Sequence, residues 1–283
     1  MIVYLAVIFS TVGQTVTTKL FSRGSKNSMV FNAIKAAASF TMFALMAVFG
    51  FTFHLPTLLF GIFYGGCMCL SMYAGYKALS LGPMALTGML VSFSVLIPLL
   101  WGVTVGNETL TTLHTVALAL LLGSIVLTNA DKLRKKAEGK SNHWLWMFYV
   151  TTTFLCNGIC SILQKEHQTL YPEQYNREFM FFAMLVCLVI YVAVTLLKIP
   201  FTEIKATKGK RYGALSGLCN GLAGFFTLML AGMENASVLF PIISAGTTLC
   251  AILCGRIIFK EKMKINHYFA LVLGILAVVL LKI

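Results

Sequence analysis

Long apolar runs separated by short polar breaks dominate the chain. Each run is close to the ~20 residues that a helix needs to cross a bilayer. We expect helices because lipid offers no partner to unpaired backbone groups, and because barrel strands would alternate polar and apolar residues. The pattern predicts an all-α integral membrane protein with ten transmembrane helices, at residues 2–20, 29–50, 56–79, 83–105, 112–130, 144–164, 179–198, 211–231, 236–259 and 266–283.

Basic residues between the runs predict how the chain is threaded. Of the 22 Lys and Arg residues, 17 fall on one side of the predicted membrane and 3 on the other, while Lys35 and Arg256 lie within spans. Cytoplasmic loops are enriched in Lys and Arg. We therefore expect a multi-pass protein of the cell (plasma) membrane with both termini outside the cytoplasm.

Composition narrows the class of protein further. Hydrophobic residues make up 58% of the chain and charged residues 11%, with a mean hydropathy of +0.85, whereas a soluble domain carries roughly 25% charged residues. Ten spans nearly exhaust the 283 residues, so we expect no appended soluble enzyme domain.

The net charge of +13 would suggest nucleic acid in a soluble protein. Here the basic residues sit in short loops, where they set topology and contact anionic membrane lipid. No basic helix or aromatic RNA-binding motif accompanies them, so no nucleic-acid partner is expected. The eight cysteines lie in apolar stretches without a CxxC pair, and we interpret them as packing residues rather than metal ligands. We expect no metal and no cofactor.

The two halves of the chain look duplicated. Glu261, His267 and Gly255 each lie 153 residues after an identical residue, namely Glu108, His114 and Gly102. Because each unit holds an odd number of spans, the two units must run in opposite directions, as in the inverted repeats of many secondary carriers. We therefore expect repeats of five helices each at residues 1–133 and 144–283, joined by a basic cytoplasmic linker at 134–143.

Two stretches, residues 75–128 and 247–281, carry a family resemblance. In each, a helix ends near a Gly, a Glu follows shortly after, and the last helix is rich in Gly, Leu and Val. This pattern resembles the second part of the EamA-type repeat in the drug/metabolite transporter superfamily. The resemblance implies ten helices around a central cavity, and substrates that are small metabolites such as amino acids, nucleotides, sugars or organic cations.

Polar side chains near the middle of a span are the candidates for substrate binding, because such groups avoid lipid and face a partner or a cavity. The strongest candidates are the amides of Gln14, Asn157 and Asn220, since an amide both donates and accepts hydrogen bonds. The alternative for each is a hydrogen bond between helices. The predicted substrate-binding residues are Gln14, Lys35, Tyr73, Ser92, Ser94, Asn157, Asn220 and Thr247.

Lys35 is the most informative charge within a span. It lies six residues after Met29, or about 9 Å along a helix. One interpretation is a cation that attracts an anionic group of the substrate or holds a gate. The other is a side chain that reaches back to the cytoplasmic surface.

The nine acidic residues all fall in loops or at helix ends. A carboxylate within the membrane is the usual device for exchanging a proton or sodium ion with a cationic substrate. We therefore favour a neutral, zwitterionic or anionic metabolite. A competing possibility is an aromatic cavity that holds organic cations or drugs by cation–π attraction, built from Tyr73, Tyr76, Phe93, Trp101 and Phe225.

The sequence thus predicts a secondary transporter of a small polar metabolite that works by alternating access. Organic-cation or drug transport is the first alternative, and a non-transporting membrane receptor or structural protein is the second. An enzyme is not expected, because no HExxH or nucleophile motif and no clustered carboxylates occur. The sequence leaves monomer and homodimer equally open.

Overall fold

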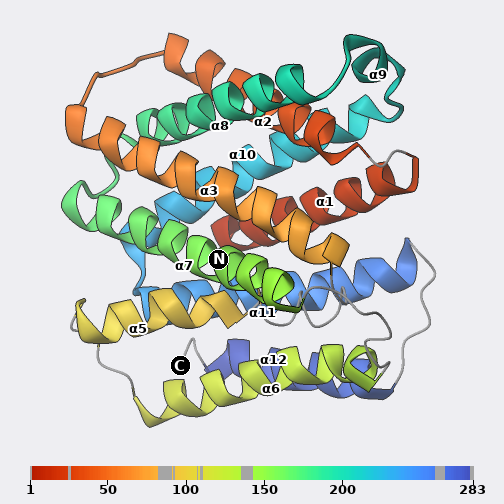
Figure 1. Cartoon of the computed structure of the whole chain (residues 1–283). Coiled ribbons are helices and arrows are strands. Elements are labelled where there is room, and N and C mark those ends of the chain that lie inside the picture. Colours follow the sequence, from red (N-terminus) through yellow and green to blue (C-terminus); the bar gives the residue numbers. More distant parts are fainter. Residues whose placement is uncertain are drawn as a thin grey trace. The chain divides into compact units, whose positions relative to one another are not determined.

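The described residues of the chain are mostly α-helical, with short loops between the helices. The computed structural model describes residues 2–24, 27–81, 91, 93–106, 108, 111–134, 143–258 and 265–280. The longer helices are α1 (Ile2–Gly24), α2 (Ser28–Val48), α3 (Leu55–Leu81), α6 (Thr112–Arg134), α7 (His143–Leu170), α8 (Asn176–Lys198), α10 (Lys210–Met233), α11 (Ala236–Ile257) and α12 (Ile265–Leu280). The shorter ones are the 3₁₀ turn η1 (Phe93–Val95), α5 (Leu96–Thr104) and α9 (Phe201–Ala206) (Figure 1).

Five helical segments are long and apolar enough to cross a membrane: Ser28–Val48, Leu55–Gly75, Trp144–Leu170, Asn176–Lys198 and Lys210–Met233. Three shorter segments are also apolar: Phe93–Thr104, Thr112–Ser124 and Ala236–Cys250. The prediction of an all-α integral membrane protein is confirmed at this level. The predicted span at 83–105 lies only partly within the described residues.

Helix α7 is longer than its predicted span, which ended at residue 164. It continues to Leu170 because the polar residues of its last turns find partners inside the protein. The ammonium of Lys165 donates to the carbonyl of Ala231 over 3.2 Å, and His167 and Gln168 are fully buried. Polar residues that would end a lipid-facing span are thereby accommodated within the helix.

The chain divides into two compact units. Unit 1 comprises Met1–Cys69 and Leu163–Gly232, and unit 2 comprises Leu70–Ile162 and Met233–Ile283. Each unit therefore combines residues from both halves of the sequence, and α3 and α7 each contribute to both.

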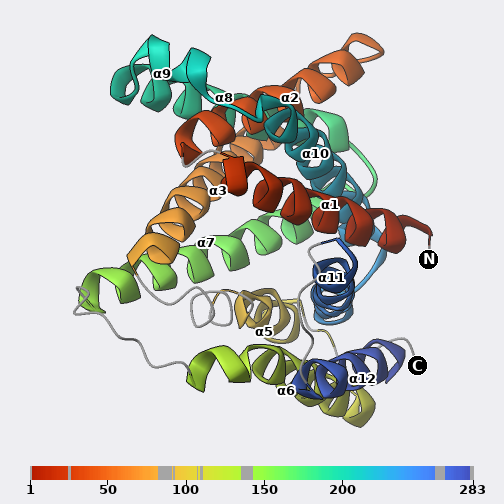
Figure 2. The ribbon, with the colours of Figure 1, turned by 90° about the vertical axis from the view of Figure 1, so that its right-hand side faces the viewer.

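Helices in unit 1 approach closely where glycines face a neighbouring helix. Helices α2 and α8 lie side by side (Figure 2). A methyl group added to Gly65 of α3 would lie 2.6 Å from the carbonyl oxygen of Ala183 in α8, and one added to Gly217 of α10 would collide with the carbonyl of Lys35 in α2. This agrees with the small-residue contacts typical of membrane helices. Gly66, by contrast, has open space beside it.

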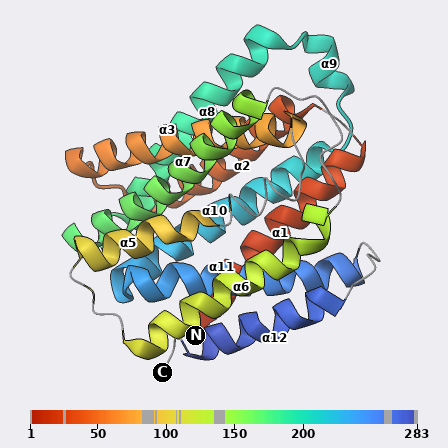
Figure 3. The same cartoon turned by 60° about the horizontal axis from the view of Figure 1, so that its bottom comes forward.

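In unit 2, α6 and α12 pack along each other (Figure 3), and α11 packs against α5, α6 and α12. The carboxylate of Glu108 accepts the backbone N–H groups of Ala236 and Ser237 over 2.7 and 2.9 Å. An anion is favourable at this position because the first N–H groups of a helix lack partners and the helix dipole is positive there. Glu108, the residue that marks the helix–Glu–helix pattern, thus caps α11. Its counterpart Glu261 lies outside the described residues.

Candidate substrate-binding site

A cavity of about 180 Å³ lies within unit 1, among helices that supply both amide and apolar side chains. Its walls come from α1, α3, α7, α8 and α10. The lining residues are Gln14, Tyr64, Met68, Gln164, Met180, Met184, Asn220, Ala223, Gly224 and Thr227. A water molecule occupies ≈ 30 Å³ in the liquid, so the cavity has room for a molecule of a few non-hydrogen atoms.

Asn220 is fixed by neighbours that belong to the same unit. Its amide nitrogen donates to the hydroxyl of Ser39 over 3.4 Å and lies 3.9 Å from the sulfur of Met184. Ser39 in turn donates to the carbonyl of Gly217 over 2.6 Å. Because these contacts engage the donor end of Asn220, its carbonyl oxygen is the atom left to accept a hydrogen bond from a ligand.

Gln164 and Gln14 extend this polar wall. The amide nitrogen of Gln164 donates to the carbonyl of Gly224 over 3.3 Å, which again leaves its side-chain oxygen as an acceptor. No hydrogen bond engages the amide of Gln14 within the described residues. The cavity therefore offers hydrogen-bond acceptors from two helices and a complete amide from a third.

The rest of the cavity wall is formed largely by flexible, apolar side chains. Met68, Met180 and Met184 line the cavity together with Tyr64. Methionine is unbranched and polarisable, so it adapts to ligands of different shape. This combination of a few placed polar groups and an apolar wall is typical of small-molecule sites.

Lys35 is covered by protein but is not among the residues that line the cavity. Its side chain is only 5% exposed. It sits one helical turn before Ser39 on α2, and Cys187 of α8 is close enough to interact with it electrostatically. Lys35 is therefore buried on the same helix as Ser39, but it is not part of the cavity wall.

The candidates in unit 2 have protein partners. Asn157 accepts the hydroxyl of Ser71 over 2.5 Å. The ring of Tyr73 packs edge-on against Tyr149 with centroids 6.3 Å apart, and the hydroxyl of Thr247 donates to the carbonyl of Ser244 in its own helix over 3.0 Å.

Two candidates remain. Ser94 lies in η1, and Ser92 lies outside the described residues. Of the eight predicted residues, the structure thus brings Gln14 and Asn220 together at the cavity in unit 1.

Gln164, Tyr64 and Thr227 line the cavity but were not predicted. Gln164 was placed at the end of its span, whereas α7 continues six residues further, to Leu170. A usable signal was present, because Gln164 follows Asn157 by seven residues, which places both amides on one face of a helix. The hydroxyl of Thr227 donates to the carbonyl of Ala223 in its own helix, so its position at the cavity carried no sequence signal.

Metal ligands do not gather within the described residues. No group of three or more His, Cys, Asp or Glu side chains there is placed to hold a metal ion. All eight cysteines are free, and they are buried or half-buried. The residues that line the cavity offer hydrogen-bonding amides, hydroxyl groups and apolar side chains.

Comparisons with known proteins agree with this architecture. A family model described as the EamA-like transporter family matches residues 141–283, about half of the chain. A solved structure titled "Crystal structure of protein" is similar to this chain at a TM-score of 0.81, with 12% identity over 99% of this chain and 94% of that one. At that identity the likeness shows the fold alone. The comparison with curated proteins gives no match. The chain belongs to the EamA-like transporter family of the drug/metabolite transporter superfamily, and it is a multi-pass membrane transporter.

Proposed function

We propose that this transporter is a secondary carrier that moves a small polar metabolite across the cell membrane by alternating access. In this proposal ten helices form two inverted repeats, at residues 1–133 and 144–283, with the linker 134–143 in the cytoplasm and both termini outside it. The offset of 153 residues between the helix–Glu–helix patterns supports the repeats. The distribution of Lys and Arg residues, 17 on one side of the predicted membrane and 3 on the other, supports the proposed orientation of the chain.

The observation that carries the proposal is the set of amides on the cavity wall. Gln14, Gln164 and Asn220 come from three helices and converge on one cavity. Polar groups within membrane helices are costly unless they meet a partner, water or a ligand. Three amides on the wall of one cavity are therefore best explained by a polar substrate that hydrogen-bonds to them.

The lining also favours a class of substrate. None of the residues that line the described cavity is acidic or basic, so a ligand with a large net charge would lose hydration without gaining an ion pair. The free side-chain oxygens of Gln164 and Asn220 call for N–H or O–H donors on the ligand. We infer a neutral or zwitterionic metabolite about the size of an amino acid.

Organic-cation transport has weaker support. Tyr73, Phe93, Trp101 and Phe225, the aromatic residues considered for a cation-binding face whose side chains the structure describes, do not line this cavity, and the aromatic ring that does belongs to Tyr64. A single ring offers less than the several rings that enclose quaternary ammonium groups.

Uptake into proteoliposomes tests the proposal. The purified protein is reconstituted and screened with pools of labelled amino acids, sugars and nucleosides. We expect uptake of at least one neutral or zwitterionic metabolite. Asn220→Leu and Gln14→Leu should each reduce its apparent affinity by about tenfold or more, because a lost hydrogen bond to a ligand costs roughly 1.4 kcal/mol.

A pair of matched threonine variants controls for general damage. Thr227 lines the cavity and Thr41 is exposed on α2, yet each hydroxyl donates to a carbonyl of its own helix over 2.8 Å. Thr227→Val should weaken uptake more than Thr41→Val. Wild-type uptake by the amide variants, measured on protein that elutes as a folded species, would refute the assignment of the cavity.

A further inference from the structure

Gly224 of α10 and Met180 of α8 meet on the wall of the cavity. A methyl group added to Gly224 would lie 2.5 Å from the terminal methyl carbon of Met180 and 3.5 Å from its sulfur. Carbon atoms in van der Waals contact prefer separations of about 3.5–4.0 Å. The end of the Met180 side chain therefore occupies space that exists only because residue 224 has no side chain.

The side chain of Met180 is drawn back from the cavity that it borders. Its relative exposure is 0%, although it belongs to the cavity wall. Phe179 and Ala183, which lie beside it on α8, are fully buried too, and protein interiors are close-packed. Within the described part of unit 1, the open space beside a displaced Met180 side chain is the cavity itself.

A larger residue at position 224 would move Met180 rather than separate the helices. The atom that it meets is the end of an unbranched side chain with three rotatable bonds. Gly65 differs, because a methyl group there meets the backbone oxygen of Ala183, which cannot turn aside. Gly224→Ala should consequently narrow the cavity while α8 and α10 keep their places.

Gly224 also joins the apolar wall of the cavity to the polar wall. Its carbonyl accepts the amide nitrogen of Gln164 over 3.3 Å, which leaves the side-chain oxygen of Gln164 as an acceptor. A ligand that hydrogen-bonds to this oxygen would lie near residue 224. The size of the groups that such a ligand can carry therefore depends on the room left by Gly224 and Met180.

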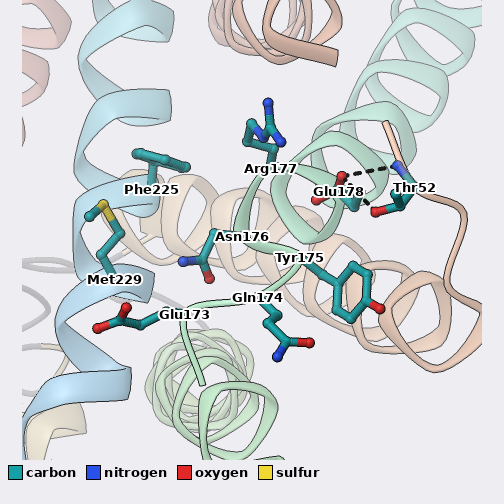
Figure 4. Close-up of a pocket in the computed structure, with 9 residues that line it drawn as sticks. All are labelled: Thr52, Glu173, Gln174, Tyr175, Asn176, Arg177, Glu178, Phe225 and Met229. Atoms are coloured by element: carbon teal, nitrogen blue, oxygen red, sulfur yellow. Dashed lines mark hydrogen bonds between the residues drawn. The ribbon is translucent and has the colours of Figure 1, made fainter. Parts of the chain in front are cut away.

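A second pocket, of about 480 Å³, uses other residues of the same helix. Phe225 and Met229 extend from α10 toward this pocket (Figure 4), whereas Gly224 and Met180 line the cavity and not this pocket. A change at the contact between Gly224 and Met180 should therefore alter the cavity and leave the second pocket as it is.

We propose that Gly224 and Met180 together set the size of the largest molecule that the cavity accepts. The cavity measures about 180 Å³. A methyl group takes up roughly as much room as one water molecule, about 30 Å³, so displacing that much side chain into the cavity would remove about a sixth of its volume. The inference rests on the proposed transport function in one respect, namely that the size limit of the cavity is also the size limit of the transported metabolite.

Thiol reagents of increasing length measure the room in the cavity without relying on transport. Thr227 lines the cavity one turn after Gly224 on α10. In a background without native cysteines, purified Thr227→Cys protein is treated with methyl, propyl or hexyl methanethiosulfonate, and mass spectrometry follows the modification. We expect Gly224→Ala to slow the hexyl reagent about tenfold or more and the methyl reagent less than about twofold, because a pocket discriminates roughly tenfold or more against a methylene group that does not fit.

Met180→Ala shows whether this effect acts through Met180. By itself it should speed the reaction of the hexyl reagent, because a shorter side chain leaves a larger space. In the Met180→Ala background, Gly224→Ala should have little effect, since no thioether is left to displace. The proposal would be overturned if Gly224→Ala slowed all three reagents equally, slowed none of them, or slowed the hexyl reagent equally with and without Met180.

Gly221→Ala is the matched control on the same helix. A methyl group there would lie 2.7 Å from the terminal carbon of Met42, and neither Gly221 nor Met42 lines the cavity. Gly221→Ala should leave the labelling of Thr227→Cys unchanged, and Gly224→Ala should leave the labelling of Met229→Cys in the second pocket unchanged. Slowing by Gly221→Ala as large as that by Gly224→Ala would refute the inference, because it would indicate a general displacement of α10.

Uptake separates this inference from the proposed function. Among the metabolites that the wild-type protein takes up, Gly224→Ala should lower uptake of the larger ones and spare the smallest. If uptake occurs and depends on Asn220, but Gly224→Ala keeps the wild-type size preference, the inference fails while the transport proposal stands. If Gly224→Ala narrows the cavity to the thiol reagents but no metabolite is taken up by the wild-type protein, the transport proposal fails and the size limit of the cavity stands.

Discussion

The two units treat polar side chains within membrane helices in opposite ways. In unit 2, the side-chain oxygen of Asn157 accepts a hydrogen bond from Ser71, and the carboxylate of Glu108 caps α11. In unit 1, Asn220 and Gln164 are held at their donor ends, and they present their oxygens to a cavity. A polar residue at mid-depth therefore makes a structural contact in the case of Asn157, and it lines a cavity, which we propose to bind substrate, in the case of Asn220.

This difference shows that burial depth alone does not identify a binding residue. What separates Asn220 from Asn157 is which side-chain atom the protein engages, the nitrogen in Asn220 and the oxygen in Asn157, and that Asn220 lines a cavity. The amide of Asn220 keeps a free oxygen beside a cavity, whereas Asn157 uses its oxygen for the hydroxyl of Ser71. Substitutions of these polar residues should accordingly change different properties. We expect changes at Asn220 in unit 1 to alter ligand affinity, and changes at Glu108 or at the Ser71–Asn157 bond in unit 2 to alter stability.

The largest effect on stability is expected at Gly65, which forms the close contact behind the cavity wall. Gly65→Ala places a methyl group 2.6 Å from the backbone oxygen of Ala183, so α3 and α8 must separate, at about 3 kcal/mol. Because Tyr64 and Met68 on the same helix line the cavity, substrate affinity should fall as well. Thermal unfolding in detergent measures the first effect and uptake the second.

The neighbouring Gly66 gives the matched control, since a methyl group there meets nothing within 4 Å. Gly66→Ala should leave stability unchanged or raise it by about 0.5 kcal/mol, because alanine favours the helix. Equal destabilisation by the two variants would show that α3 and α8 are not in close contact at Gly65.

A smaller effect is expected at Glu108 in unit 2. Glu108→Gln keeps the shape of the side chain but removes the charge that caps α11, and it should lower the free energy of unfolding by about 2 kcal/mol. Uptake per folded molecule should keep its wild-type apparent affinity. A changed affinity with unchanged stability would contradict the structural role of unit 2.

Ser71→Ala should have the smallest effect. Hydrogen bonds between membrane helices contribute about 0.6 kcal/mol on average, so loss of the Ser71–Asn157 bond should barely shift thermal unfolding. Uptake should stay within about twofold of wild type, because the bond lies in unit 2. An uptake defect as large as that of Asn220→Leu would place Asn157 in the binding site.

The positions of the helices were largely predictable, because lipid forces each span to be a long apolar run. Helices α2, α6, α8, α10, α11 and α12 lie within a few residues of their predicted spans. Helix α9 was not predicted, because its six residues include Glu203 and Lys205 in a polar, basic segment that gives no apolar pattern. The end of α7 was misplaced because the sequence does not show that Lys165 and His167 have partners inside the protein.

The candidate site was predictable only in part. Depth along a span follows from counting residues, and this identified Gln14 and Asn220. The direction in which a side chain points around the helix axis does not follow from counting residues. A helix that is apolar on all sides has no polar face that would distinguish residues facing a cavity from residues facing a neighbouring helix. The sequence consequently ranked Asn157 with Asn220, although only the latter lines the cavity.

The most direct test of the central claim is the access of water to a residue of each unit. In a background without native cysteines that still transports, Thr227→Cys and Ser71→Cys are treated with a water-soluble thiol reagent. The account predicts rapid labelling of Thr227→Cys that the transported metabolite slows, and little labelling of Ser71→Cys. Labelling of Ser71→Cys at the rate of Thr227→Cys, or labelling of Thr227→Cys that the metabolite leaves unchanged, would contradict the cavity in unit 1 as the binding site.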